Sequence, residues 1–402
     1  MKDLTPPFRS LKGKDPFALF KNVETPSFIL DEKALEYDGK ILKDVEEKSG
    51  ARILLAQKAF SNYDLYPLLS NYVYGTEASG LYEARLGKEE MPDKEVHVFS
   101  AAYREEEFEE ILKVADHIVF NSISQLKKYG EKAKGKGKSI GLRVNPEFST
   151  QVGHDIYNPC APGSRLGVTE KNFVEGMTPE LLSLLDGLHF HTLCQQNSDD
   201  LEKTFDVVEK KFSPYFSSLK WINFGGGHHI TRDDYDRERL ISLVKRVRNT
   251  YGLEVYLEPG EAVVLNAGYL LTKVLDTFDN GNTHIAILDT SAACHMPDVL
   301  EMPYRPPLYG ADLEGNEVTI HLGSQTCLSG DVIGDYRFKE PLKEGDYLLL
   351  GDMALYTTCK TNTFNGMPLP SLYLLHKDDT LEKLASFGYE DFKYRLGRSK
   401  KE

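Results

Sequence analysis

Eight short runs of strand-forming residues recur between residues 52 and 259, and a longer, more polar stretch follows each of the first seven. The runs are rich in β-branched and aromatic residues, and their alternation with helical segments is typical of a parallel sheet. Eight such units are the number that closes a barrel, so we predict a (β/α)8 TIM-type barrel. The runs are RILLA (52–56), YVYGT (72–76), VHVFS (96–100), HIVFN (117–121), IGLRVN (140–145), GLHFH (187–191), WINFG (221–225) and VYLEP (255–259).

The sequence pattern changes after about residue 265, where a second domain is predicted. Strand-like runs such as HIAILDT, EVTIHLG, DYLLLG and PSLYLL follow one another without long helices between them. A chain of 402 residues also exceeds one compact core. We expect an α/β protein with a barrel over residues 32–264 and an all-β domain over 265–402. The strand-like PSFILD can belong to either part, and we assign residues 1–31 to the β domain.

Charge and cysteine content argue against several classes of protein. The formal net charge of −14 argues against nucleic acid as a partner, because phosphate binding depends on clustered Lys and Arg. Five scattered cysteines predict reduced thiols, with neither disulfides nor a Cys-rich metal site. The sequence has no run of about twenty apolar residues and no secretory pattern, which predicts a cytoplasmic protein without a membrane partner.

Two motifs at predicted strand ends suggest a covalent anchor and an anion site. Lys58, in LLAQKAF just after the first barrel strand, can form a Schiff base, for which partial burial helps; an isolated lysine is more often only solvated. Gly225, Gly226 and Gly227 follow the seventh strand and let backbone N–H groups approach a phosphate, although a tight turn is the alternative. The neighbouring His228 and His229 lack a third metal ligand at suitable spacing, so we predict no metal site.

Two further strand ends carry groups suited to an aromatic cofactor. Glu258, in EPGE after the eighth strand, can keep a pyridine nitrogen protonated, or be only a turn residue. His191, at the end of the sixth strand, can stack on a ring, or be a satisfied core histidine. Functional groups of such barrels sit at the C-terminal ends of strands, where all four motifs fall. Together they favour pyridoxal 5′-phosphate (PLP) as the cofactor.

The ordered motifs resemble the fold-type III PLP-dependent decarboxylases, the group of the ornithine and diaminopimelate decarboxylases, whose barrel is related to that of alanine racemase. The resemblance covers nearly the whole chain. It implies that Lys58 holds the cofactor, that Arg165 in SRLG lies near its phenolate, and that His191 stacks on its ring. It also implies that the FGGG loop binds the phosphate and that Glu258 faces the pyridine nitrogen.

The resemblance continues into the second domain through TCLSGD, GDMALYT and TFNGM. It implies a homodimer with shared active sites, in which Cys327 and Asp331 of one subunit reach the barrel of its partner. Tyr356 would help to bind the phosphate. Cys327 or Lys58 would return a proton to the substrate carbon after loss of carbon dioxide.

Departures from the family pattern indicate the substrate. Ornithine and diaminopimelate decarboxylases resemble each other in the motif EPGR, whereas this chain has EPGE, with Glu261 in place of the arginine. The family pattern also has an acidic residue directly after the cysteine, and this chain has Leu328 there. An anion-binding position has therefore become one suited to an amine. Asp298 and Asp289 supply further carboxylates for a distal ammonium, although ordinary surface charge is the alternative.

This combination resembles the branch of the family that decarboxylates carboxynorspermidine or carboxyspermidine to norspermidine or spermidine in polyamine biosynthesis. Its substrate is a small cationic carboxylated polyamine. The alternatives are a diaminopimelate decarboxylase, an amino-acid racemase, and a PLP-binding protein without catalysis. Glu258 argues against the racemase. The related barrel of alanine racemase has an arginine at the pyridine nitrogen, where the resemblance places Glu258 in this chain.

Overall fold

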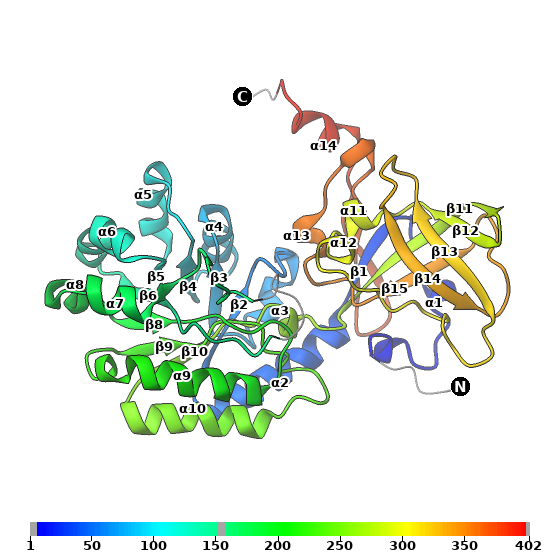
Figure 1. Cartoon of the computed structure of the whole chain (residues 1–402). Coiled ribbons are helices and arrows are strands. Elements are labelled where there is room, and N and C mark those ends of the chain that lie inside the picture. The colour runs from blue at the N-terminus through cyan, green and yellow to red at the C-terminus, as the bar shows by residue number, and fades with distance from the viewer. Residues whose placement is uncertain (1–5, 152–157, 399–402) are drawn as a thin grey trace. The chain divides into compact units, whose positions relative to one another are not determined.

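The computed structural model of the chain describes residues 6–151 and 158–398. The chain forms two compact units, each folded around its own sheet (Figure 1). Tyr37–Val263 form the barrel unit, and Met1–Glu36 with Val264–Glu402 form the sheet unit. The first boundary thus falls after Glu36, within a helix, where we expected it after residue 31.

The barrel unit is built from eight parallel strands that pair in chain order, and the pairing of β10 with β2 completes the closed ring. A two-residue strand, β7, adds to β6 outside the ring. The predicted TIM-type barrel is therefore confirmed. The strands are β2 (Arg52–Ala56), β3 (Gly75–Ala78), β4 (Glu95–Phe99), β5 (His117–Phe120), β6 (Ser139–Asn145), β7 (Val168–Thr169), β8 (Gly187–His189), β9 (Trp221–Asn223) and β10 (Glu254–Leu257).

The strand predicted at residues 72–76 overlaps β3 only at its last two residues. The backbone N–H groups of Tyr72 and Val73 both donate to the carbonyl oxygen of Leu69, at 2.8 and 3.1 Å. These bonds continue the turn that ends the preceding helix. The apolar run therefore begins as a helix terminus, and only its Gly-Thr end enters the sheet.

Helices connect the barrel strands. Two of the longest, α9 and α10, lie side by side (Figure 1). Helix α10 begins after Asp236, which accepts from the N–H of Arg239, and ends at Gly252 in the left-handed conformation that favours glycine. The helices are α2 (Glu32–Ser49), α3 (Tyr66–Leu69), α4 (Leu81–Glu90), α5 (Glu105–Val114), α6 (Ile123–Gly135), α7 (Glu170–Gly176), α8 (Pro179–Leu184), α9 (Ser198–Phe216) and α10 (Arg237–Tyr251).

The interior of the barrel is packed with side chains from several strands. Leu54, Val119, Trp221 and Tyr256 form one buried cluster, in which β5 joins the neighbouring strands β2, β10 and β9. The indole of Trp221 fills the space at Gly187 on the adjoining strand β8 and at Gly141 on the next strand, β6. A small residue beside a large one is how a closed barrel reaches the packing density of a protein core.

The sheet unit has a mostly antiparallel eight-stranded sheet in the order β14-β13-β12-β11-β1-β16-β17, with β15 paired to β11. Strand β1 lies between β11 and β16, so residues far apart in the chain share one sheet. The predicted C-terminal all-β fold is confirmed. The strands are β1 (Ser27–Asp31), β11 (Gly268–Asn280), β12 (Thr283–Leu288), β13 (Val318–Ser324), β14 (Val332–Phe338), β15 (Tyr347–Gly351), β16 (Ser371–Leu375) and β17 (Leu381–Ala385).

The longest strand, β11, was not among the predicted runs. Its first seven residues are largely buried and its last six are exposed, so it has neither one apolar run nor one regular alternation. Short helices complete the sheet unit, and the described residues contain no helix of the length and apolarity that a membrane span needs. The helices are α1 (Pro16–Leu19), α11 (Ala292–His295), α12 (Asp298–Glu301), α13 (Thr357–Lys360) and α14 (Tyr389–Tyr394).

Gly187→Ala is expected to destabilise the barrel, because the added Cβ would collide with the indole of Trp221. Overpacking of this kind costs about 1–3 kcal/mol of unfolding free energy. Gly135→Ala on helix α6 is the matched control, since its Cβ meets open space. Urea unfolding of both variants tests this, and equal stability of the two would contradict the packing described.

Candidate active site

Lys58 lies in the turn after β2, at the C-terminal end of the barrel strands, and its side chain is exposed. This differs from the partial burial that we expected. Its charge nevertheless acts on the buried groups of the site. Burial, and then the positive charges of Lys58 and Arg143, hold the pKa of His191 well below its usual value.

Glu258 follows β10 and is buried as a carboxylate with two donors. The Nε2 atom of His189 lies 2.9 Å from one carboxylate oxygen, and the side-chain amide of Asn223 donates to the other at 2.6 Å. Burial alone would raise the pKa of Glu258, but His189 and Asn223 reverse this and lower it. Burial also lowers the pKa of His189, so its neutral ring donates to the carboxylate. Glu258 is thus a fixed negative charge at the barrel end.

The glycine loop packs too closely for side chains. A Cβ on Gly226 would collide with the carbonyl oxygen of Glu258, and one on Gly227 with that of Leu193. The N–H groups of Gly225 and Gly226 are already used, since they donate to Asn223 at 2.8 Å and to His191 at 2.9 Å. In the part of the chain that the structure describes, the N–H groups of Gly227 and His228 have no acceptor. These two, and not all three glycines as expected, are available to an anion.

His191 is held by the same loop. Its Nδ1 atom accepts the hydrogen bond from Gly226, so this nitrogen carries no proton and the ring proton sits on Nε2. The neutral ring is therefore fixed against the glycine loop, as a group that stacks on a cofactor needs to be.

Arg143, on β6, is a site residue that the sequence analysis missed. Its side chain donates to the carbonyl oxygen of His191 at 3.2 Å and lies 4.6 Å from the centre of the Phe99 ring. Burial lowers the pKa of Arg143 to about 10, although Glu258 and Glu77 oppose this. Its position within an apolar run hid it, and a charged residue in a predicted buried strand is the signal that reveals it.

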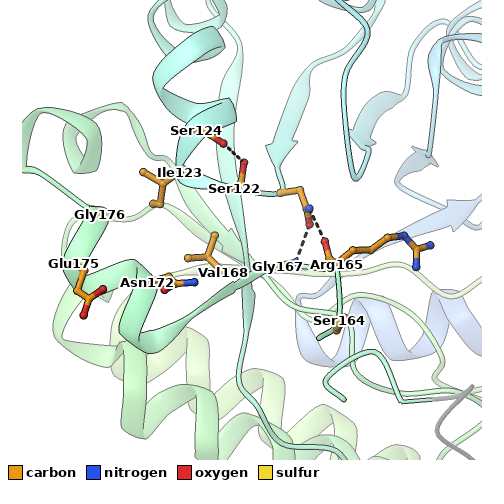
Figure 2. A pocket seen from close by; sticks show the side chains of 11 residues that line it. Ser122, Ile123, Ser124, Ser164, Arg165, Gly167, Val168, Asn172, Glu175 and Gly176 are labelled. Atoms are coloured by element: carbon orange, nitrogen blue, oxygen red, sulfur yellow. Dashed lines mark hydrogen bonds between the residues drawn. The ribbon is translucent and has the colours of Figure 1, made fainter. Parts of the chain in front are cut away.

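Arg165, predicted to lie near the cofactor, is exposed in the turn after the SRLG serine. The side chain of Asn121 holds this turn, bonding the carbonyl oxygen of Arg165 and the N–H of Gly167 at 2.8 Å each. Figure 2 shows the guanidinium extending away from Asn172 and Glu175, which line the same pocket of about 460 Å³.

Glu77, on β3, is a second residue that the sequence analysis missed. It is 5% exposed, and burial together with the Glu258 carboxylate raises its pKa to about 8, against the opposing charge of Lys58. Two buried carboxyl groups near one another cannot both ionise easily. Because Glu258 is held ionised by His189 and Asn223, Glu77 keeps its proton near neutral pH.

Glu261 lies beside the glycine loop and is held from two sides. His229 Nε2 lies 2.9 Å from one carboxylate oxygen, and the Gln195 amide donates to the other at 2.9 Å. Glu261 is thus joined within the barrel unit to His229, the second residue after the glycine loop.

In the sheet unit, the loop between β13 and β14 carries Cys327, which is exposed and has a free thiol. Asp331 anchors this loop: it accepts from the hydroxyls of Ser291 and Thr326 at 2.7 and 2.5 Å, and from the N–H of Ala293 at 3.0 Å and the hydroxyl of Ser324. Three of these donors share Oδ2, whereas Oδ1 accepts only from Ala293. Asp331 therefore holds the loop in place, and contact between Asp331 and a substrate stays a prediction.

The other predicted residues of the sheet unit are also engaged. Asp298 pairs with Lys360, which also lies 2.7 Å from Glu301. Asp289 accepts from Thr272 at 2.6 Å and from the N–H of Lys273 at 2.9 Å. Tyr356 has a left-handed backbone with φ of 56°, a strained conformation of the kind found at functional loops.

A parallel barrel with a ring of charged groups at its C-terminal end, joined in sequence to an antiparallel sheet unit, defines a class of cofactor-dependent enzyme. Residues 30–354 match the family described as "Pyridoxal-dependent decarboxylase, C-terminal sheet domain". The chain belongs to this family, so it is a carboxy-lyase that uses PLP.

Similar proteins agree with this assignment. A carboxynorspermidine/carboxyspermidine decarboxylase of Campylobacter jejuni is 42% identical, covering 94% of this chain and 99% of the relative. A carboxyaminopropylagmatine decarboxylase of Synechocystis is 39% identical, covering 94% and 96%. The crystal structure of carboxynorspermidine decarboxylase from Campylobacter jejuni, complexed with norspermidine, has a TM-score of 0.85 and 42% identity, covering 93% and 100%.

Glu77→Gln is expected to change how stability depends on pH. The folded chain keeps the Glu77 proton up to a pKa of about 8, whereas the unfolded chain loses it near the ordinary glutamate pKa of 4.5. The folded state thus binds more protons between these values, so the wild type loses stability as pH rises through that window. The variant lacks this loss, and its unfolding free energy relative to the wild type should rise between about pH 5 and pH 8.

Urea unfolding at several pH values measures this difference. Glu90→Gln, an exposed change on helix α4, is the control and should follow the wild type. Parallel profiles for Glu77→Gln and the wild type would show that Glu77 is ionised like a surface carboxylate.

Proposed function

We propose that the chain decarboxylates carboxynorspermidine or carboxyspermidine, forming norspermidine or spermidine in polyamine biosynthesis. The observation that carries this proposal is a carboxylate, Glu261, beside the anion-binding loop, where arginine stands in the EPGR pattern. The nearly full-length similarity to the Campylobacter jejuni enzyme supports it.

Within the barrel, the residues present fit PLP. When bound, PLP supplies a conjugated ring that accepts the electron pair left behind as carbon dioxide departs. Lys58 is the nucleophilic amine that holds it covalently, and Gly227 and His228 offer N–H groups to its phosphate. The glycine cradle that no Cβ can enter is the structural observation for this fit.

Three other residues set the charge around the ring. His191 presents a neutral imidazole fixed by Gly226, which suits stacking. Glu258 presents an ionised carboxylate suited to a protonated pyridine nitrogen, because His189 and Asn223 stabilise its charge. We assign Arg143, with Arg165 further out, to the phenolate side of the cofactor.

Glu261 is the barrel residue best placed to pair with a substrate amine. A carboxylate has about four lone-pair positions, and His229 and Gln195 use two of them. It can therefore accept from an ammonium while it stays held in place. Asp298 would first have to exchange its partner Lys360, and Asp289 is bonded to its own sheet, so both are secondary candidates.

We further propose that the enzyme is a homodimer with shared active sites, in which Cys327 of one subunit faces the barrel of the other. The exposed loop that carries Cys327 supports this, and Asp331 positions that loop through its four hydrogen bonds. Cys327 would then donate a proton to the substrate α-carbon, with Lys58 as the alternative acid.

Mixing two inactive variants tests the shared site. Lys58→Ala should lose the absorbance of covalently bound PLP and its turnover, and Cys327→Ala should keep the cofactor but turn over far more slowly. Random exchange of subunits leaves one intact site in half of the dimers, so the mixture should recover about one quarter of wild-type activity. A mixture as inactive as its parts would place both residues in the same subunit's site.

Carbon dioxide release from a set of substrates tests the reaction itself. We expect kcat/KM for carboxynorspermidine or carboxyspermidine to exceed that for diaminopimelate by at least about tenfold, because the distal carboxylate of diaminopimelate would face Glu261. Ornithine, which has a distal ammonium but a shorter chain, is included as a comparison. Glu261→Gln should raise KM for the triamine substrate, whereas Glu238→Gln on the outer helix α10 should not. Preference for diaminopimelate would overturn the proposal.

Carboxyaminopropylagmatine belongs in the same experiment as a second candidate substrate. The Synechocystis relative is nearly as similar as the Campylobacter jejuni one, at 39% against 42% identity. Its substrate name implies a guanidinium where the triamines carry an ammonium, and a carboxylate pairs well with either. The highest kcat/KM of the set decides between them.

A further inference from the structure

A second polar cluster lies at the end of the barrel opposite to Glu258. Glu95 is the first residue of β4 and His117 the first of β5, while His97 is the register partner of His117 on the neighbouring strand. Parallel strands place these residues at the N-terminal end of the barrel, whereas Lys58 and Glu258 follow strand C-termini. The two imidazoles are buried, and the Glu95 side chain is 27% exposed.

The three side chains converge. One possible ligand atom from each lies within 4.8 Å of the others. The Nε2 atoms of His97 and His117 lie 2.9 and 3.7 Å from the same carboxylate oxygen of Glu95. Two imidazoles and one carboxylate are the protein ligands of many zinc sites that keep a fourth position for water.

Hydrogen bonds within the protein satisfy only part of this cluster: the Glu95 carboxylate takes part in hydrogen bonds with His97 Nε2 at 2.9 Å and with the Tyr256 hydroxyl at 3.0 Å. The Nδ1 atoms of His97 and His117 are buried and have no partner among the described residues. A buried polar atom without a partner costs about 1–3 kcal/mol, so each Nδ1 atom is a place for a water molecule, while the Nε2 atoms that converge on Glu95 are the possible metal ligands.

We propose that Glu95, His97 and His117 form a binding site for one divalent transition-metal ion of the zinc type at the N-terminal end of the barrel. Imidazole with carboxylate suits zinc among the common metals. The rings are stacked at 12° with centres 3.9 Å apart, so binding tilts them until both Nε2 lone pairs meet the ion. The exposed edge of Glu95 gives the ion its entry.

Arg52 is the group that competes with the ion. Its guanidinium lies 3.7 Å from Glu95, and it also pairs with Glu254 at 3.2 Å and donates to the Tyr256 hydroxyl at 2.7 Å. Glu254 and Tyr256 hold Arg52 independently of Glu95, and the Tyr256 hydroxyl also donates to the Glu95 carboxylate at 3.0 Å, so an ion would have to compete with both Arg52 and Tyr256. A positive charge this close weakens metal binding, and its removal should strengthen it.

Zinc retention by the PLP-loaded enzyme tests the site. The protein is incubated with ZnCl2, dialysed, and analysed for metal by mass spectrometry. The wild type should retain about one zinc per chain, and Glu95→Gln and His117→Gln should each lose at least about tenfold in affinity. His284→Gln, which removes an exposed histidine paired with Asp279, is the matched control and should behave as the wild type. The proposal is overturned if the wild type retains no zinc after dialysis, or if all variants retain as much zinc as the wild type.

Arg52→Gln keeps the test decisive if the ligand variants fail to fold. It leaves all three ligands in place and should tighten zinc binding about tenfold, as measured by competition with a chelator. Titration with Co2+ should give in parallel a visible absorption band that saturates at about one equivalent. Unchanged zinc affinity in Arg52→Gln would overturn the proposal.

Discussion

The hydrogen bonds that join β5 to β6 and β10 to β2 close the parallel sheet into a ring, and the arrangement of the barrel unit depends on this closure. Because all strands of the ring run in one direction, their C-terminal ends form a single rim. Three of the site residues lie in the C-terminal halves of their strands: Glu77, Arg143 and His189. Glu258 follows its strand directly, and Lys58 lies two residues after the end of β2. Closure therefore converts residues scattered over two hundred positions into one site.

The charge of each buried carboxyl group at that rim depends on whether hydrogen-bond donors surround it. Glu258 has His189 and Asn223, which stabilise its charge, while Glu77 has the neighbouring negative charge of Glu258 and a buried environment. One carboxyl group is therefore ionised and the other protonated near neutral pH. Burying two acids close together is unfavourable for stability, and it is the kind of cost that active sites commonly carry.

Some residues of the site could be predicted from the sequence and others could not. The Lys58, glycine-loop, His191 and EPGE motifs were found because each follows a recognisable strand, and the structure places all of them at the barrel rim. Arg143 and Glu77 were missed because they lie within strands, where pattern analysis counts them as part of the run. The donors to Asp331 could not be predicted either, because two of them, Ser291 and Ala293, lie about forty positions away in the chain.

The sequence by itself determined the eight repeated units, the change to an all-β pattern, and the order of the cofactor motifs, because local periodicity and turn residues are encoded in neighbouring positions. Only the tertiary structure decided which polar groups satisfy one another. It showed Lys58 exposed, the N–H groups of Gly225 and Gly226 already used, and His97 beside His117. The physical reason is that strand register and barrel closure set these distances, and neither can be read from residues that are far apart in the chain.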